Sequence, residues 1–342
     1  MNSIWKLLKE LDNKKGITEV IINAPDLVYI EREGDLTRLN VSLIESDIQT
    51  FCEEVALNNH VLFDADHPIL DGVLPDGSRI NIIGKEYAGG FPAITIRKYI
   101  KSITTLDNLD GKFNLTDKWV SFLKAMVKSR SNVLISGGTG VGKTTFLNLL
   151  LQEITPRERV VILEDTKELK YDNPNTVRLF TPTTGTQLNN PLTMRELVKN
   201  TLRMRPDRII MGEIRGSEAF DFLTVLNTGH DGSMCTIHAN NPSEALSRLE
   251  NLFLFSGYDV PLKAIRFQVM SALDYIIQLK RDRTSGRVVS HITEVCNMEG
   301  DKILLQDIGL RGNLGASFTG LVPRKVEELY EAGLERSFFE NL

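Results

Sequence analysis

The sequence contains little cysteine and no cysteine pair. Its three cysteines, Cys52, Cys235 and Cys296, are far apart and show no Cys-x-x-Cys spacing. Disulfide scaffolds need a dense, even set of cysteines and zinc ribbons need two close pairs, so the pattern favours neither. A reducing compartment is the simpler expectation, which predicts a cytoplasmic protein.

The sequence also lacks a long apolar run. No stretch approaches the roughly 20 consecutive apolar residues that a membrane-spanning helix needs. The first 16 residues alternate apolar with charged side chains, and they lack the apolar region and the cleavage site of a signal peptide. Any membrane contact is therefore expected to be peripheral or to go through a partner.

An excess of positive charge is absent as well. The net charge is −5, and the chain contains two tryptophans, Trp5 and Trp119. Proteins that track nucleic-acid strands usually present basic, aromatic-lined surfaces. No stable nucleic-acid binding is expected, although the net charge leaves a local basic patch open.

What is present is typical of a globular protein with two domains. The composition is 42% hydrophobic and 25% charged, and domains of about 150 residues are the usual size. The first hundred residues show helical and β-rich patterns, and a polar segment with an Asp-Gly pair follows them. We predict an α+β domain over 1–105, a linker over 106–115 and a second domain over 116–342.

The second domain alternates strands with helices. Buried strands are predicted at 132–136, 160–164 and 208–212, with helical segments between them. This alternation indicates an α/β fold with a parallel sheet and right-handed crossovers. Residues 324–339 are predicted to be helical again, as a C-terminal extension.

A glycine loop follows the first of these strands. Residues 137–144 read Gly-Gly-Thr-Gly-Val-Gly-Lys-Thr, which matches the Walker A pattern. Glycines let backbone N–H groups turn toward anionic oxygens, so Lys143 is expected to neutralise the β and γ phosphates of ATP and Thr144 to hold Mg²⁺. The predicted nucleotide-binding residues of this loop are Gly138, Thr139, Gly140, Val141, Gly142, Lys143, Thr144 and Thr145.

Two other interpretations of the glycine loop were weighed against ATP binding. A dinucleotide fingerprint needs a Gly-x-Gly-x-x-Gly spacing, which residues 137–143 do not contain. A glycine-rich turn that binds nothing is the remaining alternative. The lysine favours a nucleoside triphosphate.

Carboxylates follow two of the predicted strands. Glu213 ends the strand 208–212, and an open parallel sheet places such a residue beside the glycine loop. Because Gly212 stands where a Walker B aspartate is usual, Glu213 is expected to polarise the attacking water. Glu164, at the end of 160–164, is predicted to be catalytic by orienting Mg²⁺-bound water. A solvated strand end is the alternative for both.

The segment 229–240 contains two histidines and has three interpretations. His230, Cys235 and His238 could ligate a metal, but no fourth ligand is evident. Both histidines could instead pack or cap. We prefer a γ-phosphate sensor, with His238 donating an N–H to a phosphate oxygen.

An arginine from outside the glycine loop commonly assists phosphoryl transfer. The candidates are Arg79, Arg97 and Arg205. The residues alone do not choose among them.

Taken together, these motifs resemble a known family. The chain is similar to the traffic ATPases of type II and type IV secretion, and most closely to the tight-adherence pilus branch called CpaF or TadA. The similarity extends from about Glu19 to Asp307. Its most specific runs are Asp76–Asn81, Ile94–Lys98, Leu202–Ile210 and Asn227–Ser233.

The resemblance implies a RecA-like ATPase domain and a smaller PAS-like N-terminal domain. It implies that Glu164 belongs to an Asp box, Glu213 is the Walker B glutamate, and His230 and His238 form a His box that binds nucleotide. It also implies that Arg79, Arg97 and Arg205 meet the nucleotide phosphates.

The same resemblance implies a cytoplasmic homohexamer. Such a ring hydrolyses ATP to assemble or retract a pilus, and contacts the inner membrane only peripherally, through a platform protein. Two departures from the family are expected: the N-terminal extension is nearly absent, and the loop 180–191 does not match.

Three competing functions stay open. A type IV secretion ATPase that exports protein or DNA is one. A nucleic-acid motor would need a basic channel, and a scaffold without turnover would be signalled by a replaced Lys143 or Glu213, both of which are present.

Overall fold

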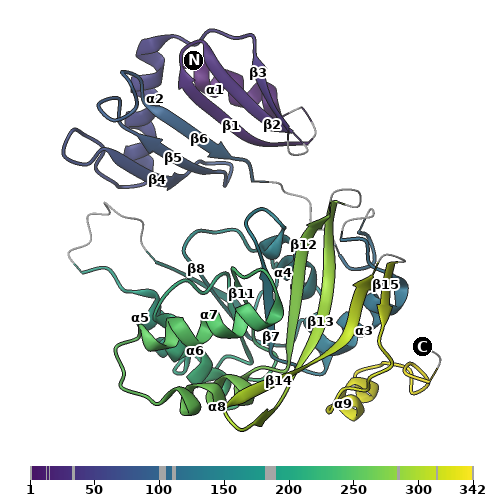
Figure 1. The fold of residues 1–342 in the computed structure, drawn as a ribbon. Helices are drawn as coiled ribbons and strands as arrows, with labels where there is room; N and C mark the ends of the chain where they lie inside the picture. The colour runs from purple at the N-terminus through teal and green to yellow at the C-terminus, as the bar shows by residue number, and fades with distance from the viewer. Residues whose placement is uncertain are drawn as a thin grey trace. The chain divides into compact units, whose positions relative to one another are not determined.

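The fold is described by a computed structural model, which divides into two compact units (Figure 1). The first unit comprises Met1–Ser102 and Thr181–Leu192, and the second comprises Ile103–Phe180 and Thr193–Leu342. The structure describes residues 2–12, 14, 16–32, 35–99, 105–109, 113–181, 190–282, 286–312 and 315–340. No helix in these ranges combines the length and the apolar character that crossing a bilayer requires.

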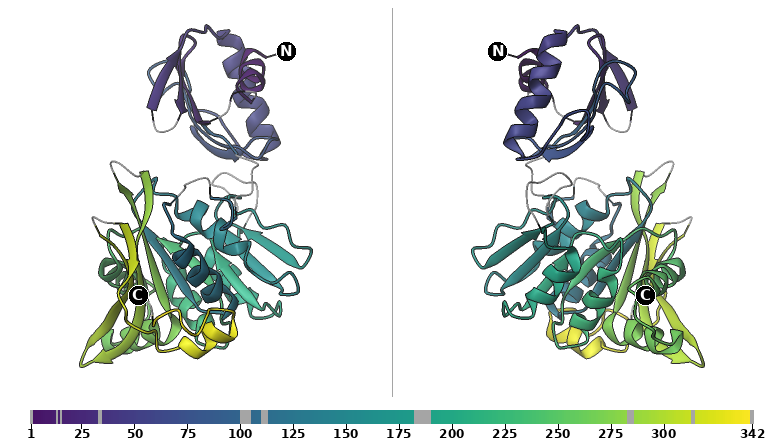
Figure 2. Two further views of the ribbon diagram at one scale, coloured as in Figure 1. Left: turned by 90° about the vertical axis from the view of Figure 1, so that its right-hand side faces the viewer. Right: turned by 90° about the vertical axis from the view of Figure 1, so that its left-hand side faces the viewer.

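The first unit is a six-stranded antiparallel sheet with order β3-β2-β1-β6-β5-β4. Both of its helices lie on one side of the sheet (Figure 2). Alternation explains this arrangement, because Val20 and Ile22 are buried under the helices while Glu19 and Ile21 are only half-buried. Its elements are α1 (Ser3–Asp12), β1 (Ile17–Ala24), β2 (Leu27–Arg32), β3 (Asp35–Leu39), α2 (Glu45–Asn58), β4 (Ile69–Val73), β5 (Arg79–Ile83) and β6 (Ala93–Arg97).

The second unit is built on a nine-stranded mixed sheet with order β15-β14-β13-β12-β7-β11-β10-β8-β9. Its first elements are α3 (Asp117–Lys128), β7 (Val133–Gly137), α4 (Lys143–Leu151), β8 (Val160–Glu164), β9 (Thr176–Phe180), α5 (Met194–Thr201), β10 (Arg208–Met211) and α6 (Glu218–Leu226). Its last elements are β11 (Met234–Ile237), α7 (Pro242–Leu254), α8 (Leu262–Ala272), β12 (Tyr275–Asp282), β13 (Gly286–Glu299), β14 (Lys302–Gly312), β15 (Gly315–Phe318) and α9 (Val326–Glu331).

Helices cover both faces of this sheet. Side chains of α3, α4 and α9 share one core with the sheet, and side chains of α5 to α8 share a second core on the opposite face. Every residue of β7, β8, β10 and β11 is buried, as expected for parallel strands between two helical layers. The predicted α/β class is confirmed.

Two expectations about the second unit were wrong. The predicted linker belongs to it, because Leu106 and Phe113 are buried in its core; residues 110–112 lie outside the described ranges. The sheet is also not parallel throughout, since β12 to β15 form an antiparallel meander beside β7. These four strands follow one another without helices between them, so the strand–helix alternation used to predict the parallel sheet did not reveal them. Most of the loop 180–191 likewise lies outside the described ranges.

Candidate functional site

The glycine loop lies between β7 and α4, as the sequence predicts. Gly142 caps α4 in the left-handed region, with φ of 94°, which a side chain would strain. A Cβ on Gly137 would lie 2.6 Å from Cγ2 of Val141 and 3.0 Å from the carbonyl oxygen of Leu279, so a side chain at position 137 would force its neighbours to shift. The loop therefore depends on glycine at both positions.

Lys143 lies at the start of α4 and is buried. Its Nζ donates a hydrogen bond of 3.1 Å to the carbonyl oxygen of Gly138 and lies 3.2 Å from Nδ1 of His238. Burial lowers the pKa of Lys143, and the charges of Arg215 and Arg248 lower it further against the opposing effect of Glu213. The ammonium group thus faces the concave side of its own glycine loop.

Parallel strand pairing brings the predicted residues to one edge of the sheet. β11 lies between β7 and β10, so His238 after β11 comes between the glycine loop and Glu213 after β10. Nε2 of His238 lies 2.6 Å from Oε1 of Glu213. Lys143, His238 and Glu213 therefore form one continuous chain of contacts.

His238 is the central group of this chain. Burial is the largest cause that lowers its pKa, followed by the charge of Lys143, while Glu213 acts in the opposite direction. A neutral imidazole is favoured near pH 7, and the short contact with Glu213 is favourable when Nε2 carries its proton. Nδ1 is then free to accept from Lys143.

Arg215 is a residue that the sequence analysis missed. Its Nε and Nη2 lie 2.7 and 2.5 Å from Oε2 of Glu213, and its Nη1 lies 3.5 Å from Oδ2 of Asp165. Arg215 thus connects the strand ends of β10 and β8 and holds the Glu213 carboxylate from the side opposite His238. The sequence contained one signal for this contact. Arg215 follows Glu213 by two residues, and at that spacing an arginine side chain can turn back to the carboxylate.

Glu164 is the last residue of β8, as the sequence predicts. Its carboxylate is buried, and Oε1 accepts hydrogen bonds of 2.8 and 2.7 Å from the backbone N–H groups of Glu168 and Leu169. Burial raises its pKa, against these hydrogen bonds and the charge of Arg178. Glu164 therefore fixes the loop after β8. The pKa of Arg215 is lowered by burial and raised by Glu213, and the charges of the neighbouring Asp165 and Glu168 raise it further.

His230 and Arg205 lie at the other edge of the same sheet from Lys143, so the structure does not bring them together with the glycine loop of their own chain. His230 precedes β11 and Arg205 precedes β10, whereas the glycine loop follows β7. The four residues of β11 rise about 13 Å. Separation by a whole strand keeps both side chains away from the glycine loop of their own chain.

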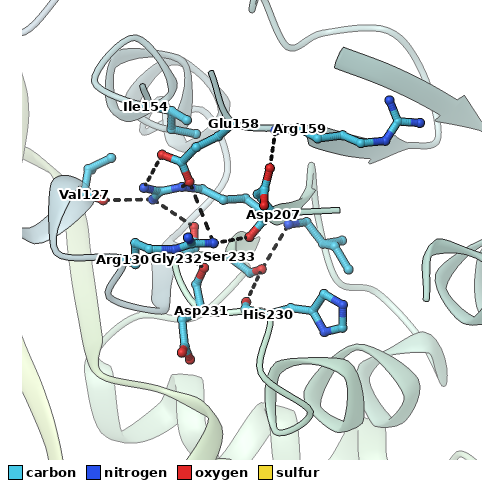
Figure 3. Close-up of polar contacts among 12 residues, drawn as sticks. Val127, Arg130, Ile154, Glu158, Arg159, Asp207, His230, Asp231, Gly232 and Ser233 are labelled. Carbon is cyan, nitrogen blue, oxygen red and sulfur yellow. Dashed lines mark hydrogen bonds and ion pairs between the residues drawn. The ribbon is translucent and has the colours of Figure 1, made fainter. Parts of the chain in front are cut away.

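Arg208, the first residue of β10, contacts Glu158, Val127 and Gly232 at this far edge, and these three partners are labelled in Figure 3. Its buried guanidinium makes paired hydrogen bonds of 2.8 and 3.0 Å to Glu158, and it donates to the carbonyl oxygens of Val127 and Gly232. Ser233 adds a hydrogen bond of 2.8 Å to the carbonyl oxygen of His230. These hydrogen bonds hold the backbone of residues 230–233 in place.

The metal interpretation of the histidine segment is wrong for the same reason. His230 and His238 flank opposite ends of β11, so they share no site within the chain. No cluster of three or more His, Cys, Asp or Glu side chains suited to a metal occurs within the described ranges.

Arg79 and Arg97 lie in the first unit. They pair directly across β5 and β6, so their side chains emerge on the same face of that sheet.

With this geometry established, the family of the chain can be assigned. The model of the family described as "Type II/IV secretion system protein" matches residues 6–302. The chain belongs to this family. The match spans both units, and it confirms the secretion ATPase resemblance in its coarser form without selecting a branch.

Relatives in the type II/IV secretion system family include several secretion and conjugation proteins. The conjugal transfer protein TrbB of Rhizobium radiobacter is 34% identical over 288 residues, covering 83% of this chain and 84% of TrbB. The type IV secretion system protein VirB11 of Brucella suis is 30% identical over 308 residues, covering 82% of this chain and 85% of VirB11.

Solved structures share the fold of this chain. The pilus retraction motor PilT with bound ADP aligns with a TM-score of 0.61 at 18% identity, over 84% of this chain and 81% of PilT. The ATPase DotB of Legionella pneumophila aligns with a TM-score of 0.60 at 20% identity, over 86% of this chain and 81% of DotB. The second unit is accordingly a RecA-like α/β domain.

Proposed function

We propose that this chain hydrolyses ATP at the glycine loop, with Glu213 as the residue that orients the attacking water. The observation that carries the proposal is the chain of contacts from Lys143 through His238 to Glu213. A cation, a hydrogen-bond donor and a carboxylate then meet at the edge where a triphosphate would end. The fold, and not closeness along the chain, brings Lys143 together with Glu213 and His238.

The residues act in a definite order in this mechanism. Phosphate oxygens replace the carbonyl oxygen of Gly138 as the partner of Lys143, because a charged acceptor binds an ammonium more strongly. His238 then donates its N–H to the γ-phosphate, and Glu213, released from that contact, accepts a hydrogen bond from water. Arg215 holds the carboxylate in place throughout.

The half-exposed hydroxyl of Thr144, next to Lys143, suits the usual Mg²⁺ ligand position of this loop. A bound Mg²⁺ would supply charge neutralisation of the phosphate oxygens. Glu164 is buried at the end of β8, and we propose that it acts on Mg²⁺ through a water molecule. The cofactors proposed are therefore ATP and Mg²⁺.

Two variants test the proposal. Lys143→Ala is expected to abolish retention of Mg-ATP, measured by equilibrium binding to the full chain, because the loop loses its only lysine. Thr145→Ala is the comparison, because Thr145 lies two residues further along α4 and its side chain is exposed. It should weaken Mg-ATP binding much less than Lys143→Ala. If the wild-type chain retained no Mg-ATP at any protein concentration, the proposed function would be wrong.

We further propose that the chain works as a homohexamer that powers a tight-adherence pilus through an inner-membrane platform protein. The support is the run of tight-adherence-like segments, such as Leu202–Ile210. ATP would favour a closed subunit over an open one, which is how a ring does work. Light scattering with and without ATP would measure the assembly.

A second candidate is an ATPase of type IV secretion. It is favoured by the relatives, since TrbB and VirB11 carry conjugation and type IV secretion names. Deletion of the gene separates the two: loss of pili supports the first, and loss of a secreted or transferred substrate supports the second.

Arg79 and Arg97 are also proposed as phosphate-binding residues. Their side chains emerge on the same face of the sheet, so one phosphate group can contact both guanidinium groups. Arg97→Ala is expected to raise the KM for ATP with the melting temperature nearly unchanged.

A further inference from the structure

A polar hollow of about 500 Å³ opens beside the glycine loop in the second unit. Gly138 and Thr139 line one side and His238 lines another. Gly138 and Thr139 belong to the glycine loop, and His238 is the residue proposed as the γ-phosphate sensor. The hollow therefore adjoins the place where the terminal phosphoryl group would lie.

The remaining wall of the hollow is one face of α7. Glu244, Ser247, Arg248 and Asn251 all line it, and their spacing of three and four residues places them on the same side of a helix. The opposite side of α7 buries Ala245, Leu246, Leu249, Leu252 and Phe253 in the core. Core packing thus fixes which side of α7 faces the hollow.

Charge on this wall is unbalanced. The carboxylate of Glu244 is engaged at the helix start, where Oε1 accepts from Asn241 at 2.7 Å and Oε2 accepts from Asn240 at 2.9 Å. Arg248 is exposed and makes no hydrogen bond or ion pair with the residues that the structure describes. Burial is the largest cause that lowers the pKa of Lys143 and of His238, and the positive charge of Arg248 lowers both further. Arg248 is therefore close enough to act electrostatically on the site.

We propose that this hollow is a phosphate-binding site, with Arg248 as its anchoring side chain. The inference rests on the proposed ATP hydrolysis and names a further residue for it. A guanidinium fork matches two phosphate oxygens at once, and an anion there would balance the like charges of Lys143 and Arg248. The ligand is the γ-phosphoryl group, either still on ATP or after its release as inorganic phosphate.

Arg248 differs from the arginines that the sequence nominated. Arg205 lies at the far edge of the sheet, whereas Arg248 lines a hollow that contains the glycine loop itself. The unit that holds Lys143 thus carries its own second cation for the phosphate. No residue from another copy of the chain is required for this contact.

The experiment compares full-length wild type, Arg248→Ala, Arg248→Lys and a matched control. Arg157→Ala is the control, because Arg157 is exposed on the loop before β8 at the far edge and makes no hydrogen bond or ion pair with the described residues. Inorganic phosphate is titrated as a product inhibitor of steady-state ATP hydrolysis. Dissociation constants for ADP, and for ATP in a Glu213→Gln background, are measured in parallel.

The expected result is a loss specific to the terminal phosphate. Arg248→Ala should weaken phosphate inhibition or ATP binding about tenfold, which corresponds to about 1.4 kcal/mol, while ADP binding changes less than twofold. Weaker ATP binding assigns the contact to the phosphoryl group on the nucleotide, and weaker phosphate inhibition alone assigns it to the released ion. Arg248→Lys should recover part of the loss.

Two outcomes separate this inference from the proposed function. If wild type hydrolyses ATP and Arg248→Ala matches Arg157→Ala in all three measurements, the phosphate site is wrong and the ATPase stands. If wild type neither binds nor hydrolyses ATP, both are wrong. An equal loss of ADP and ATP binding in Arg248→Ala would also overturn the inference, because it would indicate a general effect on the loop.

Discussion

Nε2 of His238 lies 2.6 Å from Oε1 of Glu213, and the same imidazole lies 3.2 Å from Nζ of Lys143. One ring therefore connects the residue expected to bind phosphate with the residue expected to orient water. A ligand that draws Lys143 toward it must alter the partner of His238, and through His238 the partner of Glu213. We therefore expect nucleotide binding at Lys143 and the positioning of water by Glu213 to be coupled.

The first prediction concerns Glu213. Glu213→Gln keeps the size of the side chain and removes its negative charge, so it should slow ATP hydrolysis by about 100-fold or more, the usual range for a general base. ATP binding should remain within about twofold, because no phosphate contact is lost. Single-turnover hydrolysis and equilibrium binding measure the two effects, and a normal rate would show that another group activates water.

The second prediction concerns Arg215. Its two contacts with Oε2 hold the Glu213 carboxylate, so Arg215→Ala should lower kcat about tenfold with KM for ATP nearly unchanged. Arg215→Lys keeps the charge and should restore part of kcat. A purely structural role would instead lower the melting temperature and leave kcat unchanged at low temperature, which the same preparations can measure.

The third prediction is a pH dependence of stability. The pKa of His238 in the folded chain is below its ordinary value of about 6.5, so the unfolded chain binds more protons between the two values. Stability should therefore rise as pH increases toward about 6.5 and level off above it. Denaturant unfolding from pH 5 to pH 8 checks the direction.

The variant His238→Gln isolates this effect. The pKa of His291 is lowered as well, so part of the slope should persist in the variant. A slope as steep as that of wild type would mean that His238 does not contribute. The charged groups that face His238 are Glu213, Lys143, Arg215 and Arg248.

The fourth prediction concerns the far edge of the sheet. Arg208→Met leaves the half-buried Glu158 carboxylate and two carbonyl oxygens without their partner, which should cost about 3 kcal/mol of unfolding free energy. Arg157→Ala, an exposed arginine nearby in sequence, should change it by less than about 0.5 kcal/mol. Urea unfolding provides both values, and a loss under about 1 kcal/mol would contradict the assigned role.

The fifth prediction uses two glycines of one turn. Gly229 and Gly232 have φ of +93° and +82°, but a Cβ meets nothing at Gly229 and lies 2.6 Å from Nη1 of Arg208 at Gly232. Gly229→Ala should cost about 1 kcal/mol from backbone strain alone. Gly232→Ala should cost clearly more, because Arg208 must also move. Equal losses would mean that the guanidinium shifts freely.

The sequence by itself determined the features that depend on neighbouring residues. The glycine loop, Lys143 and the strand-end Glu213 could be predicted because each depends on residues close together along the chain: a turn needs glycine at fixed offsets, and a buried strand must end in a polar group. The α/β class followed from the alternation of strands and helices for the same reason.

The order of the strands was decided only by the tertiary structure. β11 lies between β7 and β10, so His238 at its end lies beside the glycine loop and His230 before its start lies at the far edge. The two histidines are nevertheless only eight residues apart in the segment 229–240. The same packing places Arg215 and Arg248 around the glycine loop and removes Arg205 from it. These positions depend on contacts between residues distant in sequence, which periodicity and spacing do not encode.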